Sequence, residues 1–127
     1  MSASYRFLLV GTANNGWRSV LEKAVSDLGT FNVVSEDQAI ESVFNNRYDV
    51  VVIDAGAVDD ARELTSCLRT SRPETRVVVA TLSRTWRRAR QVMHAGASDY
   101  IYKTTNEGRL RSTLEDVVSR PPPRWPR

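Results

Sequence analysis

The sequence predicts an α/β fold, in which parallel strands alternate with helices, and three observations support this. Short apolar runs recur along the chain, and the stretches between them carry apolar residues at helical spacing. The run at residues 50–53 is wholly β-branched, as is typical of a central strand that is buried on both faces. The 127 residues show no internal repeat, and their number suits one domain with its own core.

Five strands are expected from the apolar runs. They fall at residues 5–10, 31–34, 48–54, 77–81 and 100–102. After each run, apolar residues recur three or four positions apart, which indicates that a helix follows every strand.

Residues that start or stop helices support these boundaries. Gly29 follows the first helical pattern, and we expect it to end that helix in a left-handed conformation. Ser35 and Gln38 match a capping box at the start of the second helix. Pro73 stops the third helix, and Ser83 is expected to cap the fourth.

Five βα units of this length build a three-layer (βα)5 sandwich with right-handed crossovers. Domains of this size commonly take the flavodoxin-like strand order 2-1-3-4-5, and we expect that order here. The carboxyl ends of the strands then share one edge of the sheet, where such folds bind their ligands. That edge brings the residues after Val10 close to Asp54, Thr81 and Lys103.

The net charge of +3 belongs to the end of the chain. Residues 120–127 hold three arginines and no acid, and without them fifteen basic residues balance fifteen acidic ones. The predicted domain, residues 1–119, is therefore formally neutral, which argues against direct nucleic-acid binding by it. The prolines in residues 120–127 indicate a polyproline-like linker or a disordered end, or alternatively a ligand for a partner's groove.

The remaining composition excludes several classes of function. Cys67 is the only cysteine and His94 the only histidine, so the chain can form neither an internal disulfide nor a zinc site. A lone cysteine suits a reducing cytoplasm. We expect no membrane span and no signal peptide. No nucleophile and base gather at the strand ends, so we expect no enzyme activity.

Asp54 is the most informative residue, because an apolar run ends at its carboxylate. Such a carboxylate can accept a phosphoryl group, or it can cap the turn or helix that follows. Thr81 can bond a phosphoryl oxygen, or it can be an ordinary β-branched residue at a strand end. Lys103 can pair with Asp54 or with a phosphate on it, or it can be a solvated lysine.

Together with residues 95–103, these positions resemble the receiver domain of two-component response regulators. That stretch reads AGASDYIYK, close to the family pattern A-G-A-x-D-Y-apolar-x-K, and the resemblance covers about residues 5–119. It implies a phosphorelay function, with a histidine kinase or a phosphotransfer protein as partner. By resemblance, Asp54 is the phosphoacceptor and Lys103 the site lysine. Thr81 and the aromatic Tyr100 are then the switch pair that turns inward on phosphorylation.

The sequence departs from the family pattern where Mg²⁺ should bind. Receivers usually place two acidic residues directly after strand one to hold this ion, and here Gly11 and Thr12 stand in those positions. Residues 13–16 supply no carboxylate either. Asp54 alone would bind Mg²⁺ weakly, and Mg²⁺-dependent phosphorylation should be much weaker than usual.

Two further departures lie beside the expected site. Residues 55–60 lack the family's proline and are one residue shorter, and Thr104 replaces the cis-proline that usually follows the lysine. This leaves open whether Lys103 points toward Asp54 or elsewhere. Two functions stay open within the family. One is a receiver that is phosphorylated on Asp54, and the other is a pseudo-receiver that acts by protein contacts alone.

Receivers usually signal through the face formed by the fourth helix, the fifth strand and the fifth helix. Here the fourth helix carries a basic group around a tryptophan: Trp86, Arg87, Arg88 and Arg90. This is either a solvated helical face with a partly buried tryptophan or a surface for a partner protein. One such partner is a second copy of the domain, whose Glu115 and Asp116 can pair with these arginines.

A rival function from another class rests on the glycine-rich turn at residues 11–16. Backbone N–H groups of such a turn can hold phosphate, which would make the chain a small nucleotide- or phosphate-binding domain. The spacing matches the G-x-x-x-x-G part of a P-loop, but Trp17 and Arg18 stand where that motif needs Lys and Ser or Thr.

Overall fold

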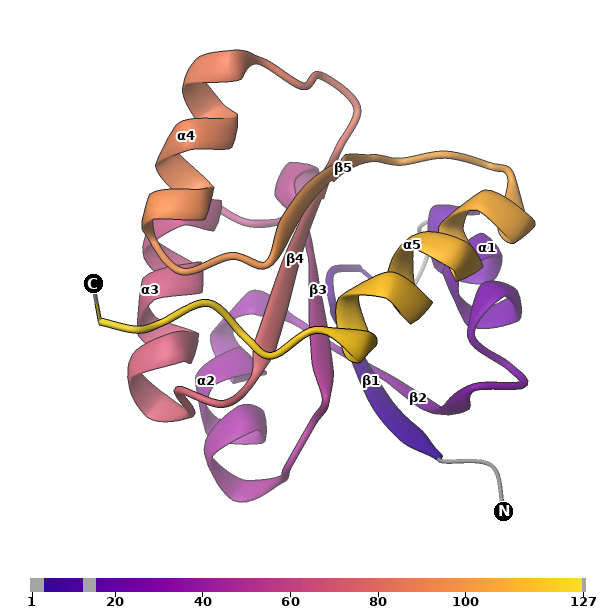
Figure 1. Ribbon diagram of the computed structural model, residues 1–127, viewed down its shortest axis with the longest axis horizontal. Coiled ribbons are helices and arrows are strands. Elements are labelled where there is room, and N and C mark those ends of the chain that lie inside the picture. The colour runs from indigo at the N-terminus through magenta and orange to yellow at the C-terminus, as the bar shows by residue number, and fades with distance from the viewer. Residues whose placement is uncertain (1–3, 13–15, 127) are drawn as a thin grey trace.

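The computed structural model describes residues 4–12 and 16–126 and shows a parallel sheet between two layers of helices (Figure 1). The strand order is β2-β1-β3-β4-β5, so the predicted flavodoxin-like three-layer sandwich is confirmed. In chain order the elements are β1 (Tyr5–Val10), α1 (Gly16–Ala24), β2 (Gly29–Val34), α2 (Glu36–Asn45), β3 (Val50–Asp54), the 3-10 helix η1 (Ala55–Ala57), α3 (Ala61–Ser71), β4 (Arg76–Thr81), α4 (Trp86–His94), β5 (Asp99–Tyr102) and α5 (Glu107–Ser119).

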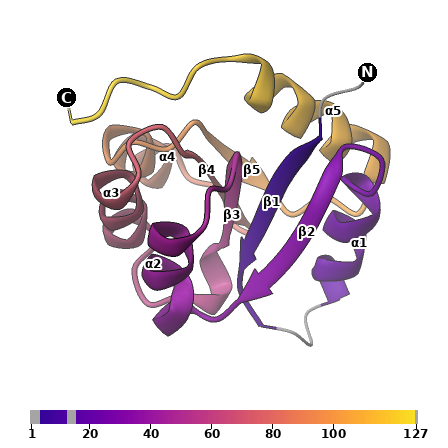
Figure 2. The ribbon, with the colours of Figure 1, turned by 90° about the horizontal axis from the view of Figure 1, so that it is seen from below.

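The sheet has a hydrophobic core on each face. Helices α1 and α5 cover one face, and α2, α3 and α4 cover the other (Figure 2). Successive residues of β3 point into opposite cores, so that Val51 and Ile53 face one and Val50 and Val52 the other. Every residue of β3 is buried, as its β-branched sequence predicted.

Gly29 does not end the first helix, so that prediction was wrong. Helix α1 ends at Ala24, a turn follows, and Gly29 is the first residue of β2. It pairs with Tyr5, and a Cβ on Gly29 would lie 1.7 Å from the Tyr5 carbonyl oxygen. Glycine is needed here because β1 and β2 approach too closely for a side chain.

The two predicted helix caps differ from the structure in different ways. Ser35 is the N-cap residue of α2, as predicted, but the capping box does not form, because its hydroxyl donates to the Asp37 carboxylate instead of accepting a helical N–H. Ser83 lies in the loop before α4, and the N-cap of that helix is Thr85, whose hydroxyl accepts from the Arg88 N–H at 3.2 Å. The nearby Asp37 carboxylate offers the Ser35 hydroxyl a charged acceptor. Ser83 is too far from the first turn of α4 to cap that helix.

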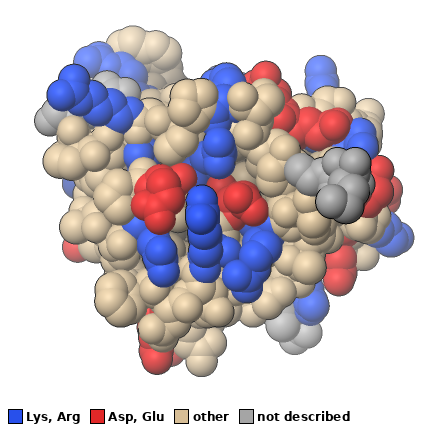
Figure 3. All heavy atoms as spheres, turned by 60° about the horizontal axis from the view of Figure 1, so that its bottom comes forward, with Lys and Arg blue, Asp and Glu red and all other residues tan. Residues whose placement is uncertain are grey.

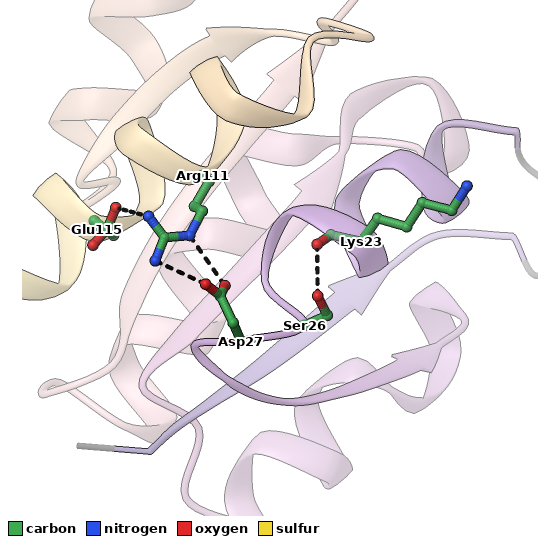
Figure 4. A network of polar contacts seen from close by, with 5 residues as sticks. All are labelled: Lys23, Ser26, Asp27, Arg111 and Glu115. Carbon is green, nitrogen blue, oxygen red and sulfur yellow. Dashed lines mark hydrogen bonds and ion pairs between the residues drawn. The ribbon is translucent and has the colours of Figure 1, made fainter. Parts of the chain in front are cut away.

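A polar network joins α5 to the turn after α1 (Figure 4). Arg111 donates from Nε and Nη2 to the two carboxylate oxygens of Asp27, at 3.0 Å each, and from Nη1 to Glu115 at 2.7 Å. The bond from Arg111 holds the pKa of the Asp27 carboxyl below its ordinary value. The two-pronged contact fixes this turn against α5.

Residues 120–126, expected to be a linker or a disordered end, run from α5 toward α3 along the body (Figure 1). The side chain of Arg69, on α3, is buried, and its Nη2 donates to the Pro123 carbonyl at 2.5 Å. Its other donors reach the carbonyls of Pro73 and Gly96. Burial lowers the pKa of Arg69 from its ordinary value. A buried guanidinium needs such acceptors in place of water, so it fastens this segment to the fold.

Candidate functional site

The candidate site lies at the carboxyl end of β3. Asp54 is the last residue of that strand, which runs between β1 and β4, and its side chain is 1% exposed. Because all five strands are parallel, Gly11, Thr81 and Lys103 reach the same edge from β1, β4 and β5. The sequence therefore placed these residues at the correct edge of the sheet.

Asp54 has two partners on one oxygen. Lys103 Nζ lies 2.5 Å from Asp54 Oδ1, and the Gly56 N–H donates to the same oxygen at 3.0 Å. The Lys103 side chain is only 10% exposed, so this is a buried ion pair. Asp54 thus caps η1, which is one of the two interpretations of this carboxylate from the sequence, and Lys103 pairs with Asp54, which is one of the interpretations of the lysine.

Trp17 belongs to the site, although the sequence analysis named it only as a departure from the P-loop motif. Its Nε1–H donates to the Thr104 carbonyl at 2.9 Å, and Lys103 Nζ lies 5.9 Å from its ring centroid. The peptide after Lys103 is therefore held by α1 although no proline stands there. Lys103 points toward Asp54, so the alternative that it points elsewhere was wrong. The available signal was a tryptophan in the first turn of α1, whose buried N–H requires an acceptor.

The two predicted switch residues are both buried. The Thr81 hydroxyl accepts from the Ser83 N–H at 3.1 Å, which ties it to the loop that follows β4. The Tyr100 side chain is 4% exposed and packs inward with Val79 and Val92 in the core beneath α4. Tyr100 thus occupies the inward position that the resemblance associates with a switch, and it also packs as an ordinary core residue.

The residues present do not fit a Mg²⁺ ion. Asp54 is the only carboxylate among the predicted site positions, and its Oδ1 already accepts from Lys103 and Gly56. A Cβ on Gly11 would lie 3.8 Å from Asp54 Oδ2, so Gly11 faces the carboxylate from the position where an acid would stand. Mg²⁺ requires six oxygen ligands in near-ideal geometry, and charged ones bind it best.

No other residues supply the missing ligands within the described ranges. Among residues 4–12 and 16–126, no three His, Cys, Asp or Glu side chains gather closely enough to hold a metal ion. Residues 13–15, which the sequence shows to lack a carboxylate, lie outside the described residues. The donor set therefore disagrees with a magnesium centre.

The predicted partner face on α4 is open to solvent. Trp86 is 75% exposed, so the alternative of a partly buried tryptophan was wrong. The Arg90 guanidinium lies 4.9 Å from the centre of its ring, a cation–π contact. Glu115 and Asp116, the acids expected to meet these arginines from a second copy, already pair with arginines of their own chain at 2.7 and 3.1 Å.

A family model described as the response regulator receiver domain matches residues 12–115. The chain belongs to the receiver domain family of response regulators. Receiver domains are signalling modules of two-component systems, so membership favours signalling over the rival phosphate-binding function. That rival also depended on residues 11–16, of which 13–15 lie outside the described residues. No curated protein sequence matches this chain.

Solved structures show the same fold. A response regulator from Thermotoga maritima is 21% identical, with a TM-score of 0.81 over 93% of this chain and 100% of its own. The orphan response regulator HP1043 of H. pylori is also 21% identical, with a TM-score of 0.81 over 93% of this chain and 99% of its own. The receiver domain of the response regulator NarL from Mycobacterium tuberculosis is 16% identical, with a TM-score of 0.79 over 92% of this chain and 98% of its own.

The surface and the helices add two observations. Basic and acidic side chains are interspersed on the face drawn in Figure 3, in keeping with the formal neutrality of residues 1–119. Among the helices of the described residues, none has the length and apolar character needed to cross a membrane.

Proposed function

We propose that this chain is a pseudo-receiver, a cytoplasmic signalling module without enzyme activity that acts through protein contacts and without Mg²⁺-dependent phosphorylation of Asp54. The observation that carries this proposal is the state of the Asp54 carboxylate. Lys103 and Gly56 hold one of its oxygens, while Gly11 stands where a metal-binding acid would be needed.

The physical argument concerns charge. Transfer of a phosphoryl group to a carboxylate requires cations that stabilise the charge on the transferring oxygens. Here Lys103 supplies one positive charge, and it is already used by Asp54 itself. Without further carboxylates the site cannot concentrate a divalent cation. The ion pair instead ties the end of β3 to the end of β5, which is a structural role.

A second candidate is a receiver whose Asp54 accepts phosphate, and one observation favours it. Lys103 lies beside Asp54 although its loop has lost the family's proline, and Thr81 still ends the strand next to β3. In that case a histidine kinase or a phosphotransfer protein would be the phosphate donor. Mg²⁺ would then need ligands other than Asp54 and the residues at positions 11 and 12.

Intact-mass spectrometry after incubation with acetyl phosphate and Mg²⁺ separates the two candidates. The pseudo-receiver gains no mass, and Asp54→Asn behaves in the same way. If the wild type gains one phosphoryl group and Asp54→Asn does not, the second candidate is correct and the first is overturned.

A gain-of-binding variant supplies the matched control. Gly11→Asp with Thr12→Asp places two carboxylates beside Asp54, which repel one another without a cation. We expect Mg²⁺ to raise the melting temperature of this variant and to leave that of the wild type unchanged. A wild-type melting temperature that rises with Mg²⁺ would contradict the proposed loss of the metal site.

A further inference from the structure

Helix α2 has an acidic face with exposed apolar side chains. Asp37, Ile40, Glu41 and Phe44 stand at positions i, i+3, i+4 and i+7 and form one exposed stripe. Ile40 is 42% exposed and Phe44 is 64% exposed. The helix carries three carboxylates and no basic residue. Apolar side chains of this size, placed between carboxylates on an open helix face, are typical of a contact surface.

Helix α4 has a face of the opposite character. Trp86, Arg87, Arg90 and His94 form an exposed stripe, and the helix holds three arginines and no acid. The side chains of this stripe line an open groove of about 850 Å³, with Arg62 of α3 beside them. Tryptophan and arginine are the residues that most often dominate protein interfaces.

The two faces cannot meet within one molecule. Helix α3 packs against α2 on one side and against α4 on the other, so the two helices that carry the stripes lie at opposite ends of the same helical layer (Figures 1 and 2). Both faces are open at the same time, and neither includes Asp54 or Lys103. Only a second molecule can bring the acidic stripe against the basic one.

We propose that the α2 face of one copy of this chain docks on the α4 face of a second copy. Opposite charges draw the two surfaces together and set their register, while Phe44 and Trp86 supply apolar area at the contact. Such a contact joins two different patches, so each bound pair keeps one open α2 face and one open α4 face. The assembly can therefore grow beyond a dimer. It does not depend on whether Asp54 takes a phosphate.

Sedimentation velocity at increasing protein concentration tests the wild type. The sedimentation coefficient rises past the value of a dimer at low salt. It falls back toward the monomer at about 0.5 M salt, where charge attraction is largely screened. A wild type that stays monomeric at low salt up to its highest soluble concentration overturns the proposal.

Two neutralised variants identify the surfaces. Arg87→Gln with Arg90→Gln removes charge from the α4 face, and Asp37→Asn with Glu41→Gln removes it from the α2 face. These positions are exposed, so both variants keep the wild-type circular dichroism spectrum. Each variant alone associates at least roughly tenfold more weakly than the wild type.

A mixture of the two variants gives the decisive result. The α4 variant still has its acidic α2 face, and the α2 variant still has its basic α4 face. They therefore combine into a one-to-one dimer that grows no further, because the remaining two faces are both neutralised. Two results overturn the proposal: a mixture that stays monomeric, or an α2 variant that associates as strongly as the wild type.

Discussion

Asp54 and Lys103 show at the residue scale how a buried charge is held. The carboxylate is almost fully enclosed, and the lysine nitrogen 2.5 Å away compensates its charge. Removing one member of a buried pair leaves the other without compensation, which costs more than the pair itself contributes. The pair is therefore best tested by comparing single and double substitutions.

Lys103→Met should lower the free energy of unfolding by about 3–5 kcal/mol, because it removes the positive charge that compensates the buried Asp54 carboxylate. The double variant Asp54→Asn with Lys103→Met should lose less than Lys103→Met alone, since no charge then remains in the site. Urea unfolding followed by circular dichroism measures both. Equal stability of Lys103→Met and the wild type would show that the pair does not form in solution.

Gly29→Ala should destabilise the domain by about 1–3 kcal/mol or more, because the added methyl group overlaps the Tyr5 carbonyl and forces β1 and β2 apart. Gly16→Ala is the matched control. A Cβ on Gly16 meets no atom of the described residues within 4 Å, and alanine there favours the first turn of α1. Thermal melting of both variants checks the prediction, and similar melting temperatures would contradict it.

At the scale of elements, Arg69 joins three segments that are distant in sequence. It belongs to α3, and its guanidinium contacts the carbonyls of Pro73, of Gly96 after α4, and of Pro123 after α5. Residues 120–126 are thus packed against the end of the domain that holds the C-terminus of α4. Their proline content explains why they form no helix, but not why they lie where they do.

Deleting residues 121–127 should lower the free energy of unfolding by about 1–3 kcal/mol, because a hydrogen bond from the charged Arg69 is lost. In an Arg69→Met background the same deletion should change stability little, since the contact is already absent. Arg124→Ala, at an exposed position, is the control and should be neutral. Guanidinium chloride unfolding of the wild type and these four variants measures the losses, and an equal loss in both backgrounds would show that Arg69 does not hold the segment.

The contact between Arg111 and Asp27 predicts a dependence of stability on pH. The pKa of Asp27 is lower in the folded domain than in the unfolded chain, because Arg111 donates to the carboxylate. The contribution of this pair is therefore complete above the unfolded pKa and is lost as the pH falls through the folded pKa, below pH ~4.

Thermal melting from pH 7 to pH 3 checks this dependence. The wild type should melt above Arg111→Gln at neutral pH, and the difference should shrink at the acid end. Because the pair is solvent-exposed, it should also shrink with added salt. A difference that grows toward acid pH would have the wrong sign for this contact.

At the scale of the whole molecule, the domain combines a neutral net charge with two charged helix faces. The +3 charge of the chain comes from residues 120–127, as the sequence showed. Within residues 1–119 the basic and acidic residues are equal in number, but α2 is acidic and α4 is basic. Net charge therefore gives no guide to association here, whereas the exposure of Phe44 and Trp86 does.

The sequence by itself determined the fold class, the strand order and the edge of the sheet on which Asp54, Thr81 and Lys103 gather. The elements follow from hydrophobic periodicity within short stretches of the chain, and their arrangement follows from the general rules for parallel sheets. It also showed that Gly11 and Thr12 lack the metal-binding carboxylates.

Only the tertiary structure decided the direction of Lys103, the role of Gly29 and the course of residues 120–126. Each depends on a partner that is remote in the chain. Trp17 holds the Thr104 carbonyl across 87 positions, and Arg69 holds that of Pro123 across 54. Local sequence patterns do not predict such partners, because the contacts form only when the layers of the sandwich pack together.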